Sequence, residues 1–166
     1  MLEKALSFIL EIDHRPTLGG VEQTIGMLLA LKGDGERAVS HLQKAIKYYE
    51  ETQTLVFLGL AWAWLGWAYC LMGQTKTAVE LTEKGLKLHI DLGIPFFRSG
   101  LHSNCGGAYF MLGDLDQARA QAELALQFAL QNKDFRQLGQ AIFQEFLPAR
   151  GNPRNNPVDL SFAESR

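Results

Sequence analysis

The feature that most constrains the fold of this chain is an internal repeat with a period of 40 residues. Small residues recur at this spacing in four columns: Gly26, Gly66 and Gly106; Gly33, Gly73 and Gly113; Ala38, Ala78 and Ala118; and Ala5, Ala45, Gly85 and Ala125. A unit of this length cannot bury its apolar face alone, so successive units stack and share one continuous core. The repeat therefore predicts an array of similar units.

Apolar residues within each unit follow the period of an α-helix. In the second unit Leu58, Trp62, Leu65 and Tyr69 are spaced by four, three and four residues, which places them on one helical face. We therefore predict an all-α fold, a solenoid of antiparallel helical hairpins. The expected helix pairs are 17–32 with 35–52, 54–72 with 75–92, and 95–112 with 115–131.

The recurring small residues have steric roles in this scheme. A glycine inside a helix, such as Gly66, costs about 1 kcal/mol relative to alanine and is tolerated where a neighbouring helix comes close. Gly33 and its two equivalents occur where a helix ends, and glycine readily takes the left-handed conformation needed there. Asp34, Thr75 and Asp114 are the expected helix caps. Pro16 and Pro95 are expected in the first turns of the helices that they open.

The repeat divides the chain into an array at 1–149 and a tail at 150–166. We expect a partial repeat at 1–12, full repeats at 17–52, 54–92 and 95–131, and the first helix of a degenerate repeat at 134–149. The tail reads as a loop followed by a truncated helix. Leu2, Leu6 and Ile9 do not form the polar cap that ends a solenoid, so we expect either a segment of a longer protein or self-association through the ends.

These residues resemble the tetratricopeptide repeat family. Its signature is matched by Trp62, Leu65, Gly66, Tyr69 and Ala78, in part by Gly106, Tyr109 and Ala118, and in part by Gly26 and Ala38. The usual repeat has about 34 residues, whereas this one has 40, as in kinesin light chains, cell-polarity scaffolds and the sensor arms of bacterial signalling ATPases and cyclase-linked regulators. The resemblance implies a right-handed α-α superhelix.

The resemblance also implies a concave groove lined by the first helix of each hairpin. The family's groove positions fall on these residues: Gln23, Met27, Ala30 and Leu31; Ala63, Trp67, Cys70 and Leu71; Ser103, Gly107, Phe110 and Met111; and Phe143 and Leu147. This surface is mostly apolar, and Trp67 is the expected anchor for a partner helix or peptide. The Lys, Arg and Asn residues that clamp a carboxylate in chaperone adaptors are absent from it.

Composition argues against several other functions. A net charge of −2 and a pI near 6.1 give no basic surface for nucleic acid or an anionic membrane. Two unpaired cysteines favour a reduced, cytoplasmic setting. The four histidines have no metal-ligand spacing, and His102 with Cys105 is a weak candidate for a catalytic pair because Cys105 occupies a core column. We therefore predict no enzyme activity, cofactor or metal.

The sequence thus leads to two functional hypotheses. The first is a non-catalytic scaffold that binds a helix or peptide of another protein in the apolar groove. The alternative is a regulatory arm of a larger signalling ATPase, cyclase or transcription regulator, which senses a ligand or partner.

Overall fold

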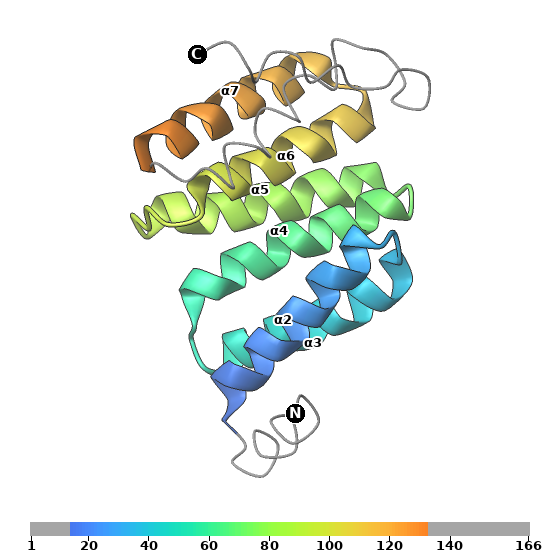
Figure 1. Cartoon of the computed structure of the whole chain (residues 1–166), viewed down its shortest axis with the longest axis vertical. Coiled ribbons are helices and arrows are strands. Elements are labelled where there is room, and N and C mark those ends of the chain that lie inside the picture. The colour runs from blue at the N-terminus through green and yellow to red at the C-terminus, as the bar shows by residue number, and fades with distance from the viewer. Residues whose placement is uncertain (1–13, 133–166) are drawn as a thin grey trace, which may run out of the picture.

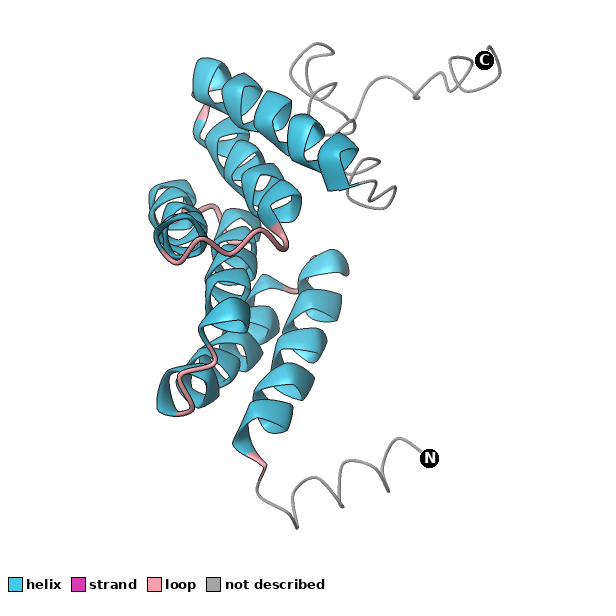
Figure 2. Cartoon of the chain, turned by 90° about the vertical axis from the view of Figure 1, so that its left-hand side faces the viewer, coloured by secondary structure: helices cyan, strands magenta, loops and turns pink. Residues whose placement is uncertain are grey.

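The computed structural model describes residues 14–132, and these residues form six α-helices without a β-strand (Figures 1 and 2). The helices are α2 (Arg15–Leu31), α3 (Gly35–Glu51), α4 (Leu55–Leu71), α5 (Thr75–Asp91), α6 (Arg98–Leu112) and α7 (Leu115–Asn132). The predicted segments at 1–12, 134–149 and 150–166 lie outside the described residues.

The helices pair as three antiparallel hairpins, α2 with α3, α4 with α5, and α6 with α7. Successive hairpins stack through α3 on α4 and α5 on α6. The first helices also touch one another, because α4 contacts both α2 and α6. The all-α solenoid expected from the repeat is therefore the fold of the described residues (Figure 1).

The hairpin turns use glycine as expected. Gly33, Gly73 and Gly113 have φ angles of +84°, +75° and +93°, the left-handed region that other residues resist. In the first turn the Gly33 amide donates to the carbonyl of Ala30, and the Asp34 amide donates to that of Leu29, both at 2.9 Å. This pairing satisfies carbonyls at the helix end and reverses the chain.

The glycines inside the first helices let the second helices approach closely. A methyl group on Gly66 would lie 2.7 Å from the Ala78 carbonyl oxygen and 2.6 Å from Cγ2 of Thr82. A methyl group on Gly26 would lie 2.6 Å from Cγ of Leu42. Real side chains do not approach so closely, so glycine at these positions is a requirement of the packing between helices.

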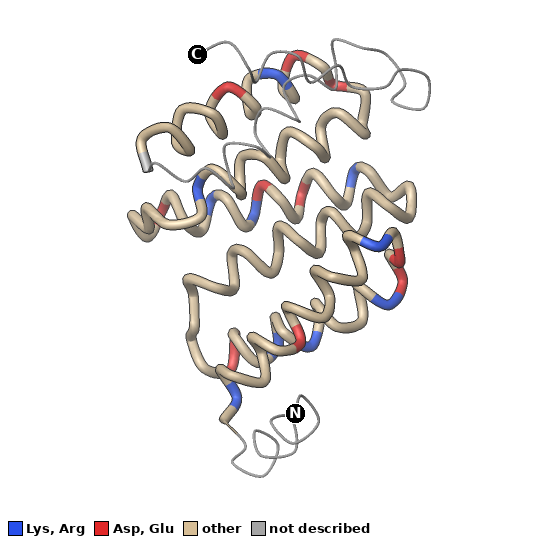
Figure 3. The backbone as a smooth tube through the Cα atoms, in the orientation of Figure 1, with Lys and Arg blue, Asp and Glu red and all other residues tan. Residues whose placement is uncertain are grey.

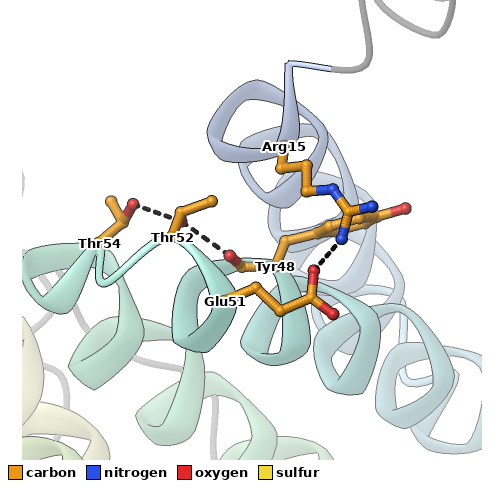
Figure 4. A network of polar contacts seen from close by, with 5 residues as sticks. All are labelled: Arg15, Tyr48, Glu51, Thr52 and Thr54. Carbon is orange, nitrogen blue, oxygen red and sulfur yellow. Dashed lines mark hydrogen bonds and ion pairs between the residues drawn. The ribbon is translucent and has the colours of Figure 1, made fainter.

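Two of the three expected caps are present. Asp34 accepts a hydrogen bond from the Arg37 amide at 3.2 Å, and Asp114 accepts one from the Gln117 amide at 3.1 Å. The expectation for Thr75 is wrong, since Thr75 is the first residue of α5 and the residue before it makes no side-chain cap. The turn between α3 and α4 has polar contacts of its own. The Thr52 hydroxyl donates a hydrogen bond to the Tyr48 carbonyl oxygen at 2.7 Å (Figure 4).

The start of α6 differs from the prediction. The helix begins at Arg98, and Pro95 lies in the preceding loop rather than in the first helical turn. Phe97 has a φ of +64°, which places it in the left-handed region before the helix starts. Buried His89 ties this loop to α4, because its two ring nitrogens lie 3.1 Å from the Phe96 carbonyl oxygen and 2.8 Å from that of Val56. This tertiary contact has no local sequence signal.

Candidate functional site

The first helices of the hairpins form an almost uncharged row. Helix α4 contains no Asp, Glu, Lys or Arg, and α6 contains only Arg98. Charged residues are concentrated instead on the second helices, as the red and blue segments of α5 show (Figure 3). A partner that meets α4 and α6 therefore encounters mainly apolar and uncharged polar side chains, whereas α2 also carries Arg15 and Glu22.

Six of the predicted groove residues keep some exposed surface: Met27, Trp67 and Phe110 are half-buried, and Leu31, Leu71 and Met111 are 67%, 40% and 49% exposed. Met27 is held by its neighbour one turn earlier, because Nε2 of Gln23 lies 3.8 Å from its sulfur. Flexible thioethers and aromatic rings offer adaptable contact area. These side chains are the accessible part of the predicted surface.

Trp67 has a double role in the structure. Its ring packs against the buried cluster that contains Ala30 and Ala68, and also against the cluster that contains Cys70 and Ala108. It therefore supports the contacts of α4 with both neighbouring first helices while retaining part of its surface. Removing the ring would disturb the core as well as any bound partner.

Six other predicted groove residues are buried, so they are not available to a partner in this structure. They are Gln23 and Ala30 on α2, Ala63 and Cys70 on α4, and Ser103 and Gly107 on α6. Small side chains let the helices pack closely, and that packing covers them. The predicted surface is therefore narrower than the sequence suggested, and Phe143 lies outside the described residues.

Exposed apolar groups of this row also lie at the C-terminal ends of the first helices. Leu31, Leu71 and Met111 occupy the same position in three successive repeats and are 67%, 40% and 49% exposed. Together they form an apolar ladder with one residue from each of α2, α4 and α6. Exposed apolar groups gathered in this way are typical of interaction surfaces.

A cleft of about 620 Å³ adjoins this ladder. It lies beside the turn between α2 and α3 and is lined by Lys32, Asp34, Glu36, Leu71 and Met72, together with two turn glycines. The charged lining residues come from the turn and the start of α3, whereas the apolar lining residues Leu71 and Met72 come from the end of α4. The sequence pattern did not indicate this cleft, because it depends on how the first hairpin sits against the second.

The two cysteines are free and buried. Burial raises the pKa of the Cys70 thiol to about 11 and that of the Cys105 thiol to about 12, so both remain protonated at neutral pH. His102 does not activate Cys105. Its Nδ1 hydrogen-bonds to Oε1 of Gln121 at 2.7 Å, its ring stacks on Phe128, and burial lowers its pKa. This pair has the properties of core packing.

Within residues 14–132 no group of three or more His, Cys, Asp and Glu side chains is arranged to hold a metal ion. In the same range no helix has the length and apolar character needed to span a membrane.

Comparison with solved structures establishes the fold. The TPR domain of Arabidopsis FLU superimposes with a TM-score of 0.62 at 15% identity, over 72% of this chain and 99% of that one. The chain has the tetratricopeptide repeat fold. The apo form of RapI gives a TM-score of 0.66 at 17% identity, over 86% of this chain and 40% of RapI.

A third tetratricopeptide-like structure is the N-terminal domain of stress-induced protein-1 from C. elegans. It matches with a TM-score of 0.53 at 16% identity, over 80% of this chain and 98% of that domain. No protein-family model and no curated protein sequence matches the chain. The relationship to tetratricopeptide proteins is therefore one of fold.

Proposed function

We propose that the chain is a non-catalytic scaffold whose first-helix surface binds a helix or extended peptide of another protein. The observation that carries this proposal is the apolar ladder on an uncharged row of helices, formed by Leu31, Leu71 and Met111. The half-buried side chains of Met27, Trp67 and Phe110 extend the proposed surface. Tetratricopeptide-like folds among the solved structures support a role in protein binding.

The expected partner segment is apolar along one face. A charged side chain placed against α4 would lose water contacts without gaining an ion-pair partner from that helix, which costs free energy. An apolar side chain would gain about 25 cal/mol for each Å² that it removes from water. We therefore expect binding to change little with salt concentration.

The test uses a photoreactive amino acid at position 71 of the full chain, with the same group at position 130 as the control. Leu130 is also exposed, at 59%, but lies on α7 rather than on a first helix. A polypeptide crosslinked only from position 71 is identified, purified and titrated against the chain.

Leu71→Glu should then weaken binding of that purified partner by about tenfold or more, while Leu130→Glu should leave it unchanged. Both variants should melt at the temperature of the unmodified chain, because both sites are exposed. Equal weakening by the two variants would show that the ladder is not the binding surface.

The second candidate function is a sensing arm in a longer signalling protein. Its support is that this chain matches only 40% of RapI, a longer protein whose structure is an apo form. In that case ligand or partner binding changes the curvature of the solenoid. Paired spin labels on exposed positions of α2 and α7 would measure this change, and an unaltered distance with the identified partner bound would exclude it.

A further inference from the structure

A second cleft, distinct from the first-helix surface, opens where the third hairpin packs on the second. Its volume is about 700 Å³, and its lining comes mainly from α5, with Cys105 of α6 and Gln121 of α7. Leu86, Ile90 and Cys105 make the apolar part, and Gln121 stands on the α7 side. Ile90 is 51% exposed, so apolar surface is open to solvent here.

The 40-residue register explains why this cleft exists. At the junction between the first two hairpins, the equivalent positions hold Leu65 and Leu81, which pack with Ile46 in one core cluster. At the junction between the second and third hairpins, these positions hold Cys105 and Gln121. Two leucines are replaced by a smaller and a polar side chain, so the second junction lacks apolar atoms that fill the first.

The charge of the cleft also departs from the repeat. Glu80 and Glu83 line it on one turn of α5, whereas the equivalent residues of α3 are Ser40 and Gln43. Both carboxylates are therefore additions relative to the first junction. They line the same cleft as Cys105 and Gln121, which replace the two leucines of the first junction.

The lysines that line the cleft are already engaged. Nζ of Lys84 lies 3.7 Å from the ring centre of Trp62, and Nζ of Lys87 pairs with Asp91 at 2.9 Å. Within residues 14–132 the carboxylate of Glu80 has no ion-pair partner. The uncompensated charge of the cleft is therefore negative.

Tyr109, which contacts Glu83 beside the cleft, is affected by the same negative charge. The Tyr109 hydroxyl donates a hydrogen bond to Glu83, and this contact together with burial raises the pKa of Tyr109 to about 12. One oxygen of Glu83 is thereby oriented by α6, while the side chain remains exposed. A cation that approaches Glu80 would also meet Glu83.

We propose that this cleft is a second protein-binding site, which takes a helical segment with an apolar side chain and a lysine or arginine one turn away. The apolar side chain would lie near the position that Leu81 takes at the first junction, against the exposed side chain of Ile90 and the edge of Leu86. The cation would pair with Glu80 and Glu83. Because these acids and apolar residues are themselves about one turn apart on α5, a segment lying along this helix matches them with the same spacing.

The probe is an alanine-based peptide of about 16 residues, long enough to be helical, with one leucine and one arginine four positions apart. Control peptides carry alanine for leucine or glutamate for arginine. Each peptide is titrated into the full chain while backbone and glutamine side-chain amide signals are followed by NMR. We expect shifts on α5 and α7 for the leucine–arginine peptide alone, with affinity that falls as salt screens the charges.

Two substitutions of Gln121 distinguish the effect of filling the cleft from the effect of losing the side-chain hydrogen bond of Gln121. Gln121→Leu and Gln121→Ala both remove the hydrogen bond with His102, but only leucine refills the hollow. Gln121→Leu should weaken peptide binding about tenfold, whereas Gln121→Ala should retain it. Replacing Glu80 and Glu83 with serine and glutamine, their equivalents in α3, should weaken binding about fivefold and remove most of its salt dependence.

Several results would overturn the proposal. One is the absence of shifts on α5 and α7 with any peptide, and another is equal binding by Gln121→Leu and Gln121→Ala. Shifts confined to the first helices would support the scaffold surface and reject this cleft. A wild-type dimer that becomes monomeric with Gln121→Leu would show that a second copy of the chain occupies it.

Discussion

Gly66→Ala is expected to destabilise the fold, although alanine is the better helix former. Gly66 lies in the middle of α4, and a methyl group there would meet the Ala78 carbonyl oxygen at 2.7 Å and Cγ2 of Thr82 at 2.6 Å. The carbonyl belongs to the backbone of α5, so it cannot rotate away. Helices α4 and α5 would have to separate along their contact.

The expected magnitude follows from two opposing effects. Replacing glycine with alanine inside a helix is worth about 1 kcal/mol in favour of alanine. Overpacking a close contact costs about 1–3 kcal/mol, and the upper part of that range applies at Gly66 because a backbone atom blocks relaxation. The free energy of unfolding should therefore fall by about 2 kcal/mol.

Gly20 provides the matched control. It also lies inside a helix, α2, but the nearest atom to an added methyl group is the Tyr49 hydroxyl oxygen at 3.9 Å. Here only the helix preference acts, so Gly20→Ala should raise the free energy of unfolding by about 1 kcal/mol. The same substitution is thus expected to lower the free energy of unfolding at position 66 and to raise it at position 20.

The assay is urea unfolding of the full chain, followed by circular dichroism and by tryptophan fluorescence. Coincident transitions would justify two-state free energies, which repeat arrays do not always obey. If Gly66→Ala proved as stable as Gly20→Ala, the close approach of α4 and α5 would not be the reason for glycine in this column. Our explanation of the repeat would then be wrong.

Three further predictions concern single side chains. Burial lowers the pKa of His102 below its usual 6.5, so the unfolded chain binds a proton that the folded chain resists. Stability should therefore fall as the pH drops from 7 to 5, and urea unfolding of His102→Gln should show a smaller fall. Cys70 and Cys105 should react with a thiol reagent at pH 8 only as fast as the fold opens, because burial raises both pKa values; rapid labelling of the folded chain would contradict this. Gln53 has a φ of +53° at the position where the next repeat has a glycine. Gln53→Gly should therefore raise the free energy of unfolding by about 0.5 kcal/mol. A lower melting temperature of this variant would show that the backbone at Gln53 is not strained.

The helices and turns were predictable because their signals are local. Helical spacing identified the six helices, although the start of α6 was misplaced. Gly33, Gly73 and Gly113 marked turns because a left-handed residue ends each of those helices. The cap predicted at Thr75 is absent, because a hydroxyl near a helix start does not determine which residue is the last before the helix.

The groove was predictable only in outline. The resemblance to the tetratricopeptide family placed Gln23, Ala63 and Ser103 on the proposed surface, yet all three are buried. Which side of a first helix faces solvent depends on how closely its neighbours approach, and no local pattern reports that distance. The cleft at Cys105 and Gln121 did have a signal in the sequence, since both residues break a leucine column of the repeat.

The sequence by itself determined that this chain forms a stack of helical hairpins. The repeat of glycines, alanines and apolar residues acts within one hairpin or between nearest neighbours, so its consequences can be derived without coordinates. Only the tertiary structure decided which side chains remain available to a partner. Exposure depends on atoms from several helices at once, and it left an apolar ladder on the first helices and an acidic, incompletely filled cleft between the second helices.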